Sequence, residues 1–317
     1  MVAVLFALVS AVGYGGSDFA AGLASRAASV VRVTIVAEAA SVLLMLLIVP
    51  WVSTGTPSAA SVAWAVAAGL GGMAGAMALY LGFRHAAFSV AAPLSAVASA
   101  AFSVLAGLLF GERPGGLALT GIALALPAIV AVSASPGEPA AHPAEAAAHS
   151  ADAAATAASP DASQDTEQAS ARRGGPGPHL AGVLYGLAAG AGFGVLFIGL
   201  NRSGSGSDLW PAVIAQVTGL VFVCLLGVAR GQLRLPGRRA SWLGVLTGVA
   251  GAAGTLCYFV ATHEGLLAVT AVITALYPAG TILLARLLLG ERLTIIRVAG
   301  LGLAAASVAL IAVAGGA

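Results

Sequence analysis

Two short strings, LLFGER at residues 108–113 and LLLGER at residues 287–292, end two apolar runs of this 317-residue chain in the same way. They lie 179 positions apart, and each closes with a glycine and a Glu-Arg pair. Rarer residue types repeat in the same order at an offset of 178, namely Trp64 with Trp242, Tyr80 with Tyr258, and His85 with His263. Apolar helices share Leu and Ala by chance, but they share a Trp, a Tyr, a His and a Gly-Glu-Arg string far less readily. The sequence therefore indicates an internal duplication.

The composition is that of a membrane protein. Hydrophobic residues make up 59% of the chain, charged residues only 8%, and the mean hydropathy is +0.99, whereas a soluble domain carries about 25% charged residues. A soluble core could not bury this much apolar surface, so we expect an integral protein of the lipid bilayer. The net charge of +2 is small and no basic patch interleaves with aromatic residues, which excludes a nucleic-acid partner.

Ten stretches are long and apolar enough to cross a bilayer, which requires about 20 residues. They are residues 2–23, 30–50, 61–83, 87–109, 115–134, 179–200, 210–229, 241–262, 266–289 and 294–314. Residues 135–178 break this pattern, because they are rich in Ala, Ser, Pro and acidic residues and hold no aromatic residue. We expect them to form a disordered linker. The linker separates two repeats of five predicted helices each, residues 1–134 and residues 179–317.

Five is an odd number, so two repeats that fold alike must enter the membrane from opposite sides. We therefore predict an all-α integral membrane fold of ten transmembrane helices, built as two inverted five-helix repeats. Inverted repeats are typical of secondary transporters, which bind a solute near the midplane and expose it to each side in turn. Gly111 and Gly290 should end the fourth helix of each repeat as left-handed caps on opposite faces. We expect the adjoining Glu112 and Glu291 to lie at the water interface and to play no part in transport.

The chain resembles the EamA family of the drug/metabolite transporter superfamily. The segments that carry the resemblance are SVAAPLSAVASAAFSVLAGLLFGERPGGLALTGIALAL at residues 89–126 and LAVTAVITALYPAGTILLARLLLGER at residues 267–292, and it extends over the chain apart from the linker. It implies a ten-helix exporter of small metabolites, amino acids or drugs in the plasma or inner membrane, usually driven by an ion gradient. It also implies that both termini lie in the cytoplasm.

The arginine distribution predicts the other orientation. When the connections between predicted helices are counted from the first, the odd ones carry eleven Arg residues and the even ones carry two. Cytoplasmic loops are enriched in Arg and Lys, which would place the odd connections in the cytoplasm and both termini outside. The two orientations remain open alternatives.

Two acidic residues lie within the predicted helices, where a charged side chain is costly and often functional. Glu38 lies nine residues into its span, about 13 Å deep, and an offset of 178 pairs it with Gln216. A carboxyl at that depth favours its protonated form, so we expect Glu38 to bind the coupling proton or a cationic group of the solute. The alternative is a protonated Glu38 that only hydrogen-bonds a neighbouring helix. Asp18 lies about 8 Å from the end of the first span, which fits either a second coupling site in a cavity or an interfacial hydrogen bond.

Other polar or aromatic side chains within the spans are candidates for the solute pathway: Tyr14, Ser17, Ser95, Ser99, Gln216, Tyr258, Thr274 and Tyr277. Small hydroxyl residues also pack between membrane helices, and Tyr258 could instead anchor at the membrane interface. Pro93 and Pro278 lie inside apolar runs, where a proline frees a backbone carbonyl, so each is a candidate hinge.

The sequence contains no Ser-His-Asp set, no HExxH string and no pair of catalytic acids, and its two cysteines lie in apolar runs. We therefore expect no enzyme, no cofactor and no metal site. The sequence predicts a secondary transporter of a small molecule, coupled to an ion and best to a proton. A channel or a non-transporting membrane scaffold is the alternative.

Overall fold

The computed structural model describes residues 1–25, 28–85, 88–133, 178–204, 206, 208–289 and 294–314. Within these ranges the chain is helical and has no strand, so the predicted all-α class is confirmed. The helices are α1 (Val2–Ser25), α2 (Val30–Val52), α3 (Ala59–His85), α4 (Phe88–Leu109), α5 (Gly116–Ser133), α8 (Pro178–Arg202), α9 (Trp210–Ala229), α10 (Arg238–Glu264), α11 (Leu267–Thr274), α12 (Tyr277–Leu289) and α13 (Ile295–Ala314). Eight segments are long and apolar enough to cross a membrane, and Leu94–Leu109 and Gly116–Val132 are two shorter apolar helices.

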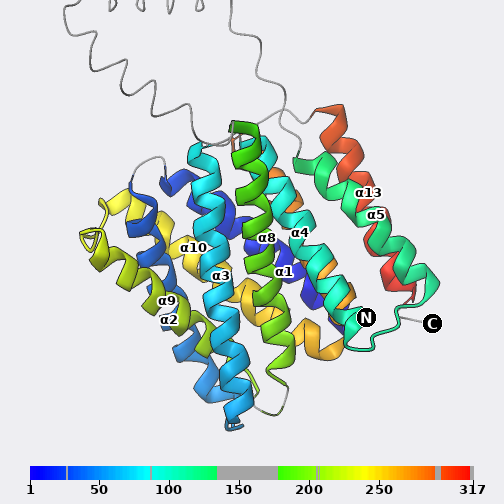
Figure 1. Cartoon of the computed structure of the whole chain (residues 1–317), viewed down its shortest axis with the longest axis horizontal. Coiled ribbons are helices and arrows are strands. Elements are labelled where there is room, and N and C mark those ends of the chain that lie inside the picture. Colours follow the sequence, from blue (N-terminus) through cyan, green and yellow to red (C-terminus); the bar gives the residue numbers. More distant parts are fainter. Residues whose placement is uncertain are drawn as a thin grey trace, which may run out of the picture.

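These helices confirm the ten predicted spans to within three residues at each end. Figure 1 shows α1 beginning and α13 ending on the same side of the bundle. We call this side the terminal face, and it carries residues 53–58, 110–115, 203–204, 206, 208–209 and 265–266. The other side, the opposite face, carries residues 28–29 and 230–237. The predicted linker, apart from Pro178 at the start of α8, lies outside the described residues.

The ninth span consists of two helices, α11 and α12, which are separated at Ala275 and Leu276. Pro278 accounts for the break, because it has no N–H to donate to the carbonyl of Thr274 and its ring would clash with that carbonyl. The N–H of Leu276 donates instead to the carbonyl of Ile273 at 3.1 Å, in a tighter turn. The structure thus places a helix break at one of the two candidate hinges.

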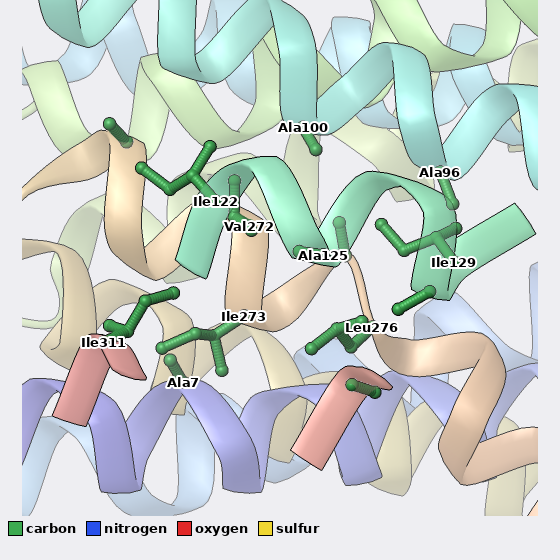
Figure 2. Packing of buried hydrophobic residues seen from close by; sticks show 14 of the residues in the cluster. Ala7, Ala96, Ala100, Ile122, Ala125, Ile129, Val272, Ile273, Leu276 and Ile311 are labelled. Atoms are coloured by element: carbon green, nitrogen blue, oxygen red, sulfur yellow. The ribbon is translucent and has the colours of Figure 1, made fainter. Parts of the chain in front are cut away.

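The helix break is buried inside the protein. Val272 and Ile273 are 0% exposed and Leu276 is 6% exposed. Figure 2 shows these side chains among those of α4 and α5, such as Ala100 and Ile122. Irregular backbone at membrane depth is tolerated only where protein covers it or where it lines a cavity. The surrounding helices therefore make the interrupted ninth span possible.

The two repeats interlock, because α1 packs along α10 and α3 packs along α8. Gly13 meets Gly254 at the first of these crossings, and Gly192 meets Gly75 at the second. A Cβ on Gly13 would lie 2.9 Å from Gly254, and a Cβ on Gly192 would lie 2.6 Å from Gly75, so glycine alone lets these helices approach so closely. An offset of 179 relates the two crossings residue by residue. This equivalence is the pseudo-two-fold relation expected of inverted repeats.

The glycine of the first GER string ends α4 as predicted. Gly111 has a φ of +90°. The N–H groups of Gly111 and Glu112 donate to the carbonyls of Leu108 and Gly107 at 3.1 and 2.9 Å. This is the Schellman pattern, in which a left-handed residue satisfies the last carbonyls of a helix. Its repeat equivalent, Gly290, lies outside the described residues.

Candidate functional site

A cavity of about 160 Å³ lies in the middle of the bundle. Its wall comes from α1, α2 and α3 of the first repeat and from α8, α9 and α10 of the second. The lining extends from Ala215 and Leu196, about 8–9 Å from the terminal-face ends of α9 and α8, to Val30, the first residue of α2 at the opposite face. Its volume is close to that of an engineered cavity of about 150 Å³ that holds benzene. In this state, therefore, the cavity fits a small solute.

Glu38 and Gln216 meet in the cavity where α2 and α9 pack together. Gln216 Nε2 donates to Glu38 Oε2 at 3.3 Å and also donates to the hydroxyl oxygen of Ser41. The Glu38 side chain is partly exposed because it borders the cavity. The offset of 178 predicted equal depth for Glu38 and Gln216, and the structure brings the two side chains into contact. The amide thus holds the carboxyl at the centre of the molecule.

Tyr14 and Thr255 form a hydrogen-bonded pair in the cavity wall. Their hydroxyl oxygens are 3.0 Å apart, and Thr255 Oγ1 also lies 3.0 Å from the carbonyl oxygen of Gly251. A carbonyl can only accept, so the Thr255 hydroxyl donates to Gly251 and the Tyr14 hydroxyl donates to Thr255. The Tyr14 oxygen is then available to accept a hydrogen bond from a solute.

The ionisable side chains that line the cavity are acidic. Asp18 is exposed at the wall beside Ser17, and the described lining residues include two acids, Asp18 and Glu38, and no basic residue. Two carboxylates without a compensating base attract cations and protons. Tyr14 and Phe193 add aromatic rings, whose faces also attract cations. The cavity is therefore suited to a small cation or to protons and unsuited to an anion.

Sequence reasoning missed Ser41 and Thr255, which hold Gln216 and Tyr14 in place. Ser41 lies three residues after Glu38, and residues at that spacing share one face of a helix. That spacing could have identified Ser41. Thr255 gave no comparable signal, because its partner Tyr14 lies 241 positions away in the chain.

Five predicted pathway residues do not line the cavity, namely Ser95, Ser99, Tyr258, Thr274 and Tyr277. Tyr277 packs against the apolar cluster around the helix break. Tyr258 is fully buried, and its hydroxyl donates to the carbonyl of Phe197 at 3.2 Å. This corrects the expectation that Tyr258 anchors at the membrane interface. Pathway roles for these five residues stay predictions.

Ser95 and Thr274 are repeat equivalents at an offset of 179, on α4 and α11, which pack together. Both side chains are fully buried, and neither hydroxyl has a hydrogen-bond partner among the described residues. Ser99, in contrast, donates to the carbonyl of Ala96 at 3.0 Å. Pro93 lies inside α4, which continues past it without a break, so only Pro278 has the local geometry of a hinge.

Known proteins resemble this chain in two ways: a family model matches the second repeat, and a solved structure shares the fold. A model of the EamA-like transporter family matches residues 177–313. A solved crystal structure aligns with this chain with a TM-score of 0.71 and 13% sequence identity, covering 98% of this chain and 98% of its own. At that identity the alignment shows a shared fold alone. Nineteen solved chains match in all, and no curated protein sequence matches.

Proposed function

We propose that this chain, whose residues 177–313 match the model of the EamA-like transporter family, is a membrane transporter that exchanges protons for a small organic cation by alternating access. The observation that carries the proposal is the position of Glu38, in the central cavity at the contact between α2 and α9. A carboxyl there faces both repeats and can be reached from the opposite face through the cavity.

Glu38 provides the coupling in this proposal. The protonated carboxyl is neutral and leaves no strong site for a cation, whereas the ionised carboxylate attracts one. Proton and cation therefore compete for Glu38, and each crosses only when the other has left. Gln216 keeps the carboxyl oriented in both states, because its amide can donate to the carboxylate and accept from the carboxylic acid.

The cavity wall supports a cationic solute. Asp18 adds a second carboxylate, Tyr14 offers a hydroxyl acceptor and an aromatic ring, and the described wall contains no base to bind a carboxylate or phosphate. A solute with one amine or quaternary ammonium group and few other atoms fits both the charge and the volume.

Export from the cytoplasm follows if the arginine distribution sets the orientation. The opposite face holds the Arg-rich connections, so the cavity in this state would be loaded from the cytoplasm of a cell in whose membrane the protein lies. The family resemblance implies export as well, but with the reverse orientation, in which this state would release its solute to the outside.

The proposal can be tested with the full chain in liposomes that enclose a pH-sensitive dye. Tetramethylammonium is the probe, because its charge is permanent and it carries no proton that could change the internal pH by itself. An outward gradient of the probe should drive protons inward through the wild-type protein. Glu38→Gln should abolish this proton uptake, and Asp18→Asn should raise the probe concentration needed for half-maximal uptake.

Glu264→Gln is the matched control, because Glu264 is an exposed carboxylate at the end of α10, far from the cavity wall. It should transport like the wild type. Probe flux without proton movement would indicate a channel, and no flux at all would contradict the cation-exchange proposal.

A further inference from the structure

Two carboxylates on the terminal face each bind two backbone N–H groups of the other repeat. Asp208, in the connection between α8 and α9, is the first. Its Oδ2 accepts from the N–H groups of Thr54 and Gly55 at 2.9 and 2.8 Å, in the connection between α2 and α3. Hydrogen bonds to a charged acceptor are roughly twice as strong as those between neutral groups. This contact therefore ties the second repeat to the first at the membrane surface.

Glu112 makes the second contact, in the reverse direction, from the first repeat to the second. Its Oε1 accepts from the N–H of Leu267 at 2.6 Å, and its Oε2 accepts from the N–H of Ala268 at 2.9 Å. These residues begin α11, where unpaired N–H groups and the helix dipole favour a negative charge. Gly107 leaves room for the carboxylate, because a Cβ there would overlap Glu112 Oε2. Protein donors on the other repeat thus hold Glu112, which corrects our expectation of a simple interfacial residue.

Two further features accompany these contacts on the terminal face. Asp208 has a φ of 47°, and it alone has a positive φ among the described residues other than glycine. Asp enters this left-handed region more readily than most residues, but a local constraint is still needed to hold it there. Arg202 at the end of α8 places its guanidinium carbon 4.7 Å from the centre of the Phe110 ring, which again joins the two repeats.

Among the described residues, the equivalent connections on the opposite face meet in a weaker contact. Ser29 and Gln232 are the repeat equivalents of Asp208 and Thr54, at offsets of 179 and 178. They meet there in one neutral hydrogen bond of 2.6 Å, from the Ser29 hydroxyl to Gln232 Oε1. The cavity lining includes Val30, the first residue of α2 on this face, and no described residue from the connections of either face. The equivalent connections thus carry a charged contact on the terminal face and a neutral one on the opposite face.

We propose that Asp208 and Glu112 are the two latches of a gate on the terminal face, and that both must release before the cavity opens to that side. This proposal rests on the proposed function, transport by alternating access. Release is reversible because water can replace the backbone N–H donors at the membrane surface. In this proposal Glu112, the acidic residue of the first GER string, takes part in the transport cycle.

The test follows the accessibility of the cavity from each side of the membrane. The reporter is Ser17→Cys, a substitution of similar volume in the cavity wall, in a chain whose native Cys224 and Cys257 are replaced by alanine. A membrane-impermeant thiol reagent is added to one side of sealed vesicles at a time. Gly115→Cys on the terminal face and Arg234→Cys on the opposite face show which side the reagent reaches.

The reporter should react from the opposite face when both latches are intact. Asp208→Asn or Glu112→Gln should raise its labelling rate from the terminal face by about tenfold each, which corresponds to about 1.4 kcal/mol per latch. Asn suits position 208 because it also tolerates a positive φ. Glu264→Gln, which removes an exposed carboxylate from the same face, should change nothing. An unchanged labelling rate in the double latch variant would overturn the proposal.

A disulfide that holds the two connections together tests the same gate by preventing it from opening. A disulfide between Thr54→Cys and Asp208→Cys should stop the probe-driven proton uptake, and reduction should restore it. Unaltered transport in the oxidised protein would also overturn the gate. The labelling assay needs neither a substrate nor a proton gradient. If labelling shifts as predicted while no variant transports the probe, the proposed function fails and the gate stands.

Discussion

Replacing Gly192 by alanine tests how the two repeats pack. A Cβ at this position would lie 2.6 Å from three backbone atoms of α3, the carbonyl oxygen of Gly71 and the nitrogen and Cα of Gly75. Ordinary Cβ contacts begin at 3.4 Å, and a backbone cannot move aside as a side chain can, so α3 and α8 must separate. Overpacking of this kind costs about 1–3 kcal/mol. Each kcal/mol lowers the melting temperature by about 2–4 °C in proteins of about 150–250 residues.

The assay is thermal unfolding of the purified protein in a mild detergent, followed by tryptophan fluorescence. Gly302→Ala is the matched control, since a Cβ there meets no atom within 4 Å, and it should not lower the melting temperature. Gly13→Ala, at the equivalent crossing with a closest approach of 2.9 Å, should lower it by less than Gly192→Ala. If Gly192→Ala has the same melting temperature as Gly302→Ala, α3 and α8 do not cross as closely as described. The equivalence of the two crossings then loses its support.

Two further substitutions separate structural from transport roles. Pro278→Ala restores an N–H for the carbonyl of Thr274 and favours a continuous helix by up to about 3 kcal/mol of helix propensity. This variant should have a higher melting temperature and should transport the probe more slowly. Pro127→Ala in the unbroken α5 is the control and should leave the transport rate unchanged. Tyr258→Phe removes a buried hydrogen bond to Phe197 and should lower the free energy of unfolding by about 1 kcal/mol. A change in the half-saturating probe concentration with no loss of stability would instead support the predicted role of Tyr258 in the solute pathway.

Much of the fold follows from the sequence, because the apolar length needed to cross a bilayer fixes helix positions closely. The offset of 178 also predicted that Glu38 and Gln216 share one depth, since repeats that fold alike place equivalent residues equivalently. Proline marked the break in the ninth span. Its exact place, at Ala275 and Leu276, depends on how α4 and α5 enclose it, which no local pattern encodes.

The contacts of Tyr258, Asp208 and Glu112 could not be predicted from the sequence, for physical reasons. A tyrosine near a span end suits both an interface and a core, and only the packing of Phe197 against Tyr258 decides between them. Acidic residues in connections are usually hydrated, so the sequence did not indicate that Asp208 and Glu112 bind backbone N–H groups of the other repeat. Their partners lie 153 to 156 positions away in the chain, and contacts at that range appear only when the two repeats are brought together.

In the proposed cycle Glu38 couples proton movement to cation movement, and this coupling can be measured as proton uptake driven by tetramethylammonium in Glu38→Gln liposomes. This variant should take up no protons and should exchange labelled for unlabelled probe more slowly than the wild type at every pH, because its neutral side chain leaves no strong site for a cation. Proton uptake at the wild-type rate in Glu38→Gln would contradict it.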